Sequence, residues 1–114
     1  MIDLAMETIQ GALHGLAARQ RTIADNVANT ETPGFLAGQV SFEDSLKNAI
    51  ENGGDPSSVQ PTVTRSDAPT NVNGNNVSLD DETVSMMKTG MQYQLMVEAM
   101  TAKFNILRIS IGKG

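Results

Sequence analysis

The stretch that decides the fold lies near the end of the chain, where residues 79–111 are LDDETVSMMKTGMQYQLMVEAMTAKFNILRISI. A row of positions spaced alternately 4 and 3 residues apart runs through it, and eight of the ten positions are apolar. A strand would alternate every two residues, whereas this spacing predicts a helix that packs along a partner. The row consists of Leu79, Thr83, Met86, Gly90, Tyr93, Val97, Met100, Phe104, Leu107 and Ile111.

A second row with the same spacing occupies the start of the chain. Gln20 is its only polar position. This row predicts a helix from about residue 2 to residue 27, long enough to pack against the C-terminal helix as an antiparallel, coiled-coil-like hairpin. The row consists of Ile2, Met6, Ile9, Leu13, Leu16, Gln20, Ile23 and Val27. We call the two rows the N-terminal and C-terminal seams.

The segment between the seams is polar, with one short helix predicted inside it. Ser41 and Asp44 have the spacing of a capping box, and Gly53-Gly54 follows as a stop signal. The apolar positions of this short helix fall on one face, at Phe42, Leu46 and Ile50.

Residues 55–76 are rich in Pro, Ser, Thr, Asn and Gly, so we expect an irregular loop with at most one extended piece near residues 59–65. Ser78 and Asp81 form a second possible capping box at the start of the last helix. The chain is therefore predicted to be mainly α, with an axial helix in residues 1–30, a turn, short helix and loop in 31–77, and a second axial helix in 78–114.

The C-terminal helix carries more apolar side chains than one partner helix needs. Met87, Met91 and Met96 lie off the seam, as do Leu95, Ile106 and Ile109. Methionine repacks easily against different neighbours, so these three form a candidate adaptable face for partners. A wide apolar face on a small chain indicates assembly.

Composition excludes several classes of function. The formal net charge of −5 argues against nucleic-acid binding, which needs a basic patch over the phosphates. The absence of cysteine excludes disulfides and thiolate metal sites. No apolar run approaches the length of a membrane span, and residues 1–20 lack the basic and continuous apolar regions of a secretory signal.

Catalytic chemistry is poorly supplied as well. His14 is the only histidine, and no cysteine or glycine-rich phosphate loop accompanies it. The acidic run Asp80-Asp81-Glu82 resembles a cation site, but acidic residues at a helix start are explained by the helix dipole. We therefore predict no enzyme activity, no cofactor and no metal.

One segment carries a specific family resemblance. Residues 26–35 are NVANTETPGF and follow the first seam directly. They resemble the signature of the flagellar rod and hook proteins, in which an amphipathic helix ends in Asn-x-Ala-Asn followed by Thr-Pro-Gly and an aromatic residue. The positions that match are Asn26, Ala28, Asn29, Thr32, Pro33, Gly34 and Phe35.

A second match narrows the resemblance to one rod subunit of that family. Residues 74–82, GNNVSLDDE, are similar to its Gly-Asn-Asn-Val-x-Leu-x-x-Glu segment, and the methionine-rich helix that follows is similar too. The chain departs from the family at Leu36-Ala37, where members usually carry Lys or Arg, and in its short middle region.

The resemblance implies a structural subunit of the proximal flagellar rod, without enzymatic activity. Its implied partners are copies of itself, other rod proteins, the MS-ring and the rod–MS-ring junction protein (FliE). It also implies export through the flagellar type III apparatus, without a cleaved signal peptide, to a rod that crosses the periplasm. Isolated helices cannot bury their seams, so we expect chain ends that fold fully on assembly.

Two other classes of protein remain open from the sequence. One is another axial rod subunit, and the other is a coiled-coil adaptor or secretion chaperone outside the flagellum. The adaptor explains both seams but leaves the Asn26–Phe35 block without a reason.

Overall fold

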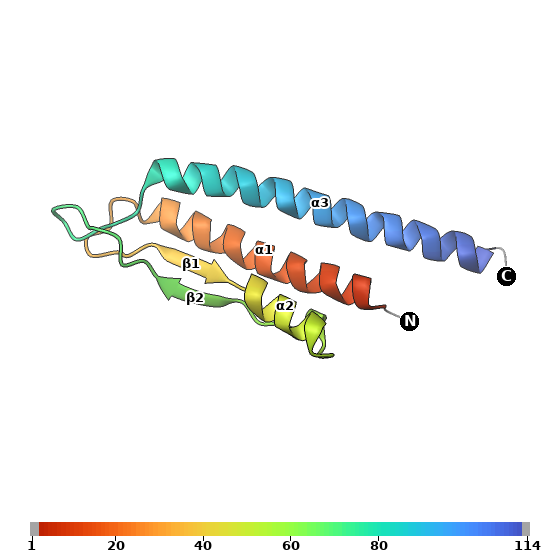
Figure 1. Ribbon diagram of the computed structural model, residues 1–114. Coiled ribbons are helices and arrows are strands. Elements are labelled where there is room, and N and C mark those ends of the chain that lie inside the picture. Colours follow the sequence, from red (N-terminus) through yellow and green to blue (C-terminus); the bar gives the residue numbers. More distant parts are fainter. Residues whose placement is uncertain (1–2, 113–114) are drawn as a thin grey trace.

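Two long antiparallel helices lie side by side along the molecule, as Figure 1 shows. They are α1, Leu4–Ala28, and α3, Leu79–Gly112. The computed structural model describes residues 3–112, which form an elongated body of 66 × 27 × 15 Å. The predicted mainly α fold with long terminal helices is confirmed.

A third layer covers the side of α1 that faces away from α3 (Figure 1). It contains the strands β1, Gly38–Ser41, and β2, Thr62–Arg65, which pair antiparallel with Val40 opposite Val63. It also contains the helix α2, Glu43–Glu51, and the short 3₁₀ turn η1, Pro56–Ser58. Because α1 is the middle layer, it must present packing surface on two sides.

Small residues let the third layer approach α1 closely. A Cβ atom at Gly15 would overlap the Phe42 ring, and one at Gly11 would overlap the carbonyl oxygen of Pro56. The core lies at this contact and consists of Leu16, Ala18, Val40, Phe42 and Leu46. Burial of a Leu, Val or Phe side chain contributes about 1.5–3 kcal/mol, so this cluster holds the third layer in place.

Side-chain caps define where the long helices begin. The Asp3 carboxylate accepts a hydrogen bond from the backbone N–H of Met6 at 2.9 Å, so α1 starts directly after Asp3. The Ser78 hydroxyl accepts from the N–H of Asp81 at 3.3 Å, which confirms the predicted cap of α3. Ile2, the first residue of the N-terminal seam, lies outside the described residues.

The predicted cap of the short helix is wrong. Phe42 occupies the N-cap position of α2, and no side chain accepts a capping hydrogen bond there. The reason is that Ser41 pairs with Thr62 and is held in β1. Phe42 and Leu46 are buried as predicted, whereas Ile50 is exposed.

The polar middle region is more regular than the sequence indicated. The extended piece expected near residues 59–65 is confirmed as β2, but β1 was not predicted. A strand of four residues is too short to show a reliable period of two, so only the paired structure reveals it.

The N-terminal seam faces the interior over most of its length. Met6, Leu16 and Ile23 are buried, while Ile9 and Leu13 are half-buried. Gln20 is exposed, and Val27 at the closed end of the hairpin is 37% exposed.

The C-terminal seam is predicted about one residue too late along α3. The residues of α3 that are buried or half-buried and recur at helical spacing are Glu82, Ser85, Thr89, Tyr93, Met96, Met100 and Lys103. Tyr93 and Met100 belong to the predicted seam, whereas Met86, Val97 and Phe104 are exposed. The side chain of Asn26 donates to the Glu82 carboxylate at 2.6 Å, which turns the start of α3 so that Glu82 and Thr89 face α1.

The C-terminal end of α3 extends past the N-terminal end of α1. Lys103 forms an ion pair with Asp3, directly before α1, with 2.7 Å between Nζ and Oδ2. No turn of α1 lies beside the residues after Lys103 that the structure describes. Packing of Phe104, Leu107 and Ile111 against α1 is therefore a wrong prediction, and all three side chains are exposed.

Candidate assembly site

The two segments that carry the family resemblance bind each other at the closed end of the hairpin. The Asn75 side chain is fully buried. Its amide nitrogen donates to the carbonyl oxygens of Asn29 and Thr32, each at 2.8 Å, and its oxygen accepts from the N–H of Val77 at 2.8 Å. One asparagine of the later segment thus fixes the turn of the earlier one.

A pair of glycines completes this contact. Gly34 and Gly74 have φ of 74° and 83°, a region that glycine adopts without strain. The N–H of Gly34 donates to the carbonyl oxygen of Asn73 at 2.9 Å, and a Cβ on Gly74 would meet Gly34 Cα at 3.3 Å. Gly34 is therefore explained by its positive φ, and Gly74 by its positive φ and by the close approach of the two loops.

Asn76 connects the loop before α3 to the segment just before β1 and to the segment just after β2. Its side-chain oxygen accepts from the N–H of Ala37 at 2.7 Å, and its nitrogen donates to the carbonyl oxygens of Ser66 and Ala68 at 3.2 and 3.1 Å. Its own N–H donates to the carbonyl oxygen of Phe35 at 3.2 Å. We call the contacts of Asn26, Asn75 and Asn76 the asparagine junction.

Asn26 joins three elements at once. Its side chain accepts from the N–H of Gly38 at 2.8 Å and donates to the carbonyl of Gly38 at 3.0 Å and to Glu82. Burial raises the pKa of Glu82, the hydrogen bond from Asn26 opposes this, and the Asp81 charge adds to the rise. The junction therefore sets the position and rotation of α3 relative to α1 and β1.

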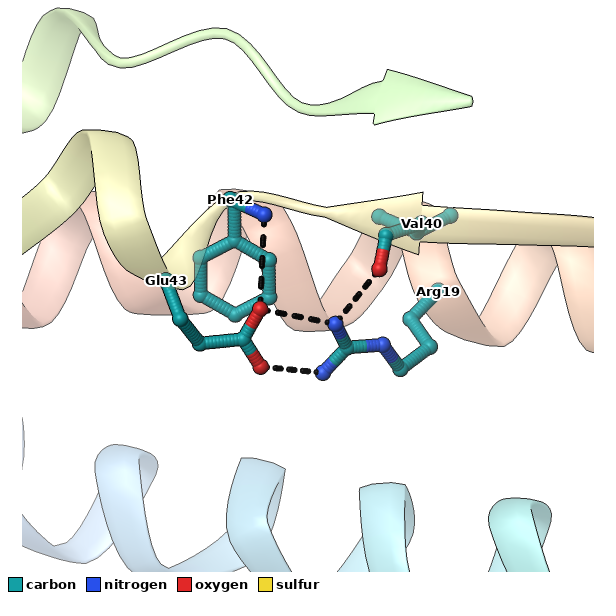
Figure 2. Close-up of polar contacts among 4 residues, drawn as sticks. All are labelled: Arg19, Val40, Phe42 and Glu43. Carbon is teal, nitrogen blue, oxygen red and sulfur yellow. Dashed lines mark hydrogen bonds and ion pairs between the residues drawn. The ribbon is translucent and has the colours of Figure 1, made fainter. Parts of the chain in front are cut away.

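Arg19, two turns before Asn26 on α1, makes a similar contact with β1 and with Glu43, as Figure 2 shows. Its guanidinium donates to both Glu43 oxygens at 2.7 and 2.9 Å and to the carbonyl oxygen of Val40 at 2.7 Å. It also lies over the Phe42 ring, 4.9 Å from the centroid. This ion pair lowers the pKa of Glu43 to about 2. Asn26 and Arg19 together occupy the edge of β1 that β2 leaves free.

The other predicted turn residues lie around the junction. Asn29 caps the end of α1 and its side chain bonds to the carbonyl of Asp25 at 2.8 Å and to the Thr32 hydroxyl at 3.0 Å. Phe35 is half-buried, 5.5 Å below the guanidinium of Arg65. Ala28, Pro33 and Gly34 are exposed.

Sequence reasoning gave no individual role to Asn75, Asn76, Arg19 or Glu43. A signal for the first two existed, because asparagine after glycine in a loop often bonds to nearby backbone. No sequence signal connects Arg19 with Glu43, since their contact depends on the placement of the third layer.

The outer side of α3 carries large apolar side chains that the hairpin leaves uncovered. Met87 and Met91 are 66% and 69% exposed and border a shallow apolar depression with Val84 and Leu95. Met96 differs from its predicted role, since it is half-buried and packs against the core. The reason is the rotation of α3 described above.

The described side chains make mainly packing contacts and hydrogen bonds within the fold. His14 is exposed on α1. Within residues 3–112, no group of three or more His, Asp or Glu side chains is placed to hold a metal ion. None of the described helices is long and apolar enough to cross a membrane.

Comparison with known proteins agrees with this arrangement. Residues 6–35 match the family described as "Flagella basal body rod protein". The "Flagellar basal body rod protein FlgB" of Bacillus subtilis (strain 168) is 31% identical over 121 residues, which cover 96% of this chain and 94% of that protein. The proteins of the same name from Escherichia coli (strain K12) and Borreliella burgdorferi are 28% and 31% identical, over 90% and 82% of this chain and 88% and 85% of those proteins.

The hairpin with apolar side chains uncovered along α3 and the similarity to these relatives together define a structural subunit of the flagellum. The chain belongs to the FlgB family of flagellar basal body rod proteins. It is a structural component of the flagellar basal body.

Proposed function

We propose that this chain is the proximal rod subunit that polymerises with copies of itself and with other rod proteins into the drive shaft crossing the periplasm. The observation that supports it is the apolar surface of α3, which stays uncovered beside a hairpin whose closed end is fixed by buried hydrogen bonds. A rigid body with one unsatisfied apolar helix is suited to a packed polymer.

The end of α3 indicates how packing continues from one subunit to the next. Leu107 follows Met100 and Lys103 at helical spacing, on the side of α3 that faces α1. Because α1 has ended there, a helix of a neighbouring subunit takes its place and covers Phe104, Leu107 and Ile111. Such a contact joins different surfaces of two copies, so it extends into a filament.

The proposed neighbours at the base of the rod are the MS-ring and the junction protein FliE. Membership of the FlgB family supports this placement, as does the sequence resemblance to the proximal subunit. Export by the flagellar type III apparatus, without a cleaved signal peptide, is part of the same proposal. Under this proposal, Phe104, Leu107 and Ile111 gain their partner at the growing tip.

Deletion of the gene, followed by imaging of purified basal bodies, tests the proposal. We expect non-motile cells whose basal bodies lack a rod, and recovery of both with the intact chain. Normal swimming with complete rods in the deletion strain would refute it.

A matched pair of variants tests the role of the α3 end. Leu107→Asp puts a charge into the proposed subunit contact and should abolish motility at normal protein levels, because desolvation of an unpaired carboxylate is unfavourable. Val72→Asp changes a fully exposed loop residue and should leave swimming intact, as should His14→Ala. Swimming by Leu107→Asp cells would show that this contact is not used.

A further inference from the structure

A straight apolar line runs along the side of α3 opposite α1. Thr89, which is buried, lies two residues from both Met87 and Met91, so their side chains point about 200° away from it around the helix. Every residue of the line is exposed. We call it the outward stripe: Val84, Met87, Met91, Leu95, Glu98, Ala102, Ile106 and Ile109. Its mean spacing, about 3.6 residues, equals the helical repeat, so the line does not wind around the helix.

The charges on α3 are segregated along the same helix. Asp80 and Asp81 are exposed at its start, and residues 79–87 contain no basic residue. Arg108 is exposed near its end, and residues 99–112 contain no acidic residue. Two parallel copies of α3 would place like charges together, whereas two antiparallel copies place opposite charges together and also oppose their helix dipoles.

The outward stripe matches itself in the antiparallel orientation. With Leu95 opposite its own equivalent, Val84 lies opposite Ile106, Met87 opposite Ala102 and Met91 opposite Glu98 of a second copy. The same register brings Arg108 next to Asp80 of the second copy. Glu98, the one charged residue of the stripe, packs its carbon stem against Met91 of the second copy, and Gln94 of that copy lies close enough to donate to its carboxylate.

From this self-complementarity we infer that the free chain forms an antiparallel homodimer through the outward stripe, with its two-fold axis at Leu95. Six large side chains per copy are more than half exposed on this line. At roughly 100 Å² each, two copies remove on the order of 1,000 Å² from water, the lower limit for a specific interface. We therefore expect a reversible dimer that exchanges with monomer.

The dimer covers Met87 and Met91 on the apolar side of α3 that the rod would use, a consequence that rests on the proposed function. It keeps that face out of non-specific contacts before assembly. The dimer itself is a property of the purified chain, so the experiments below can fail while the rod assignment stands, and the deletion experiment can fail while the dimer stands.

Sedimentation equilibrium with two methionine variants tests the surface. At about 100 μM the chain should sediment at twice its 12.1 kDa mass. Met91→Glu should raise the dissociation constant at least about tenfold, because it places a second carboxylate against Glu98 of the other copy. Met86→Glu is the matched control, since Met86 is 47% exposed but lies off the stripe, and it should leave the dimer unchanged. A monomeric chain, or equal effects of the two variants, would overturn the inference.

Engineered cysteines test the orientation, because the chain contains none of its own. Leu95→Cys should form a disulfide-linked dimer rapidly under mild oxidation. Val84→Cys alone should not, since the two copies of residue 84 would lie about 33 Å apart along the helices. A mixture of Val84→Cys and Ile106→Cys should cross-link. Self-cross-linking of Val84→Cys as fast as Leu95→Cys would establish a parallel pair and refute the antiparallel one.

A charge exchange gives an independent check. Asp80→Arg and Arg108→Asp should each weaken the dimer severalfold, and the double variant should recover it. Circular dichroism of each variant controls for loss of helix. Additive weakening in the double variant would show that the two residues do not meet.

Discussion

Replacement of Asn75 by alanine tests whether the asparagine junction fixes the closed end of the hairpin. The wild-type side chain is fully buried and takes part in three hydrogen bonds, to Asn29, Thr32 and Val77. Alanine leaves two carbonyl oxygens and one N–H without these partners. Each lost buried bond costs about 1–1.5 kcal/mol, so Asn75→Ala should lower the free energy of unfolding by about 3–4 kcal/mol.

Urea denaturation followed by circular dichroism measures this loss. A chain of this size is stable by about 6–15 kcal/mol, so the variant should remain folded. With a slope near 1.5 kcal/mol per M, its midpoint should fall by about 2 M. The measurement should be made at a chain concentration of about 1 μM, at which dimerisation does not add to the measured stability.

Two further variants make the test specific. Asn71→Ala removes an exposed asparagine of the same loop and should change stability by less than about 0.5 kcal/mol. Asn75→Asp keeps the acceptor for Val77 but points a carboxylate at two carbonyl oxygens, so it should be at least as destabilising as alanine. If Asn75→Ala lost less than about 1 kcal/mol, the junction would not be what holds the loops together.

Three more predictions concern packing and charge. Gly15→Ala should lower the free energy of unfolding by about 1–3 kcal/mol in thermal denaturation, because its Cβ overlaps the Phe42 ring, and an unchanged midpoint would contradict the close packing. Gly90→Ala should instead raise stability by about 0.5–1 kcal/mol, since a Cβ there meets nothing within 4 Å; a destabilised chain would mean that the helix is bent at this glycine. The pKa of Glu43, lowered to about 2 by Arg19, makes their ion pair fully stabilising above pH 4.5 and lost as the pH falls through about 2. The pair is partly exposed, so the difference in unfolding free energy between the wild type and Glu43→Gln should be below about 1 kcal/mol at pH 7 and vanish near pH 2; a difference that persists there would assign it to packing.

Helix content and chain organisation follow from local rules. Spacings of 3 and 4 predict both long helices, and Ser78 predicts the start of α3, because helix periodicity and capping depend on residues a few positions apart. The end of α1 also follows from a local signal, since α1 ends at Ala28, shortly before Pro33, which cannot continue a helix.

The errors arise where distant segments meet. The predicted helix cap at Ser41 is wrong because Ser41 pairs with Thr62 of β2 and so belongs to a strand. The C-terminal seam is rotated because the bond from Asn26 to Glu82 and the small buried Thr89 decide which side of α3 faces α1. Hydrophobic spacing alone could not choose between adjacent rows of a helix that is apolar on several sides.

The sequence by itself determined two long helices, the turn between them and the excess of apolar surface on the second helix, since each depends on spacing along the chain. Tertiary structure alone decided which row of α3 is buried, how far α3 extends past Asp3, and that the two family segments hydrogen-bond to each other. The physical reason is that buried polar groups must find partners, and Asn26, Asn75 and Asn76 find theirs on segments far away in the chain.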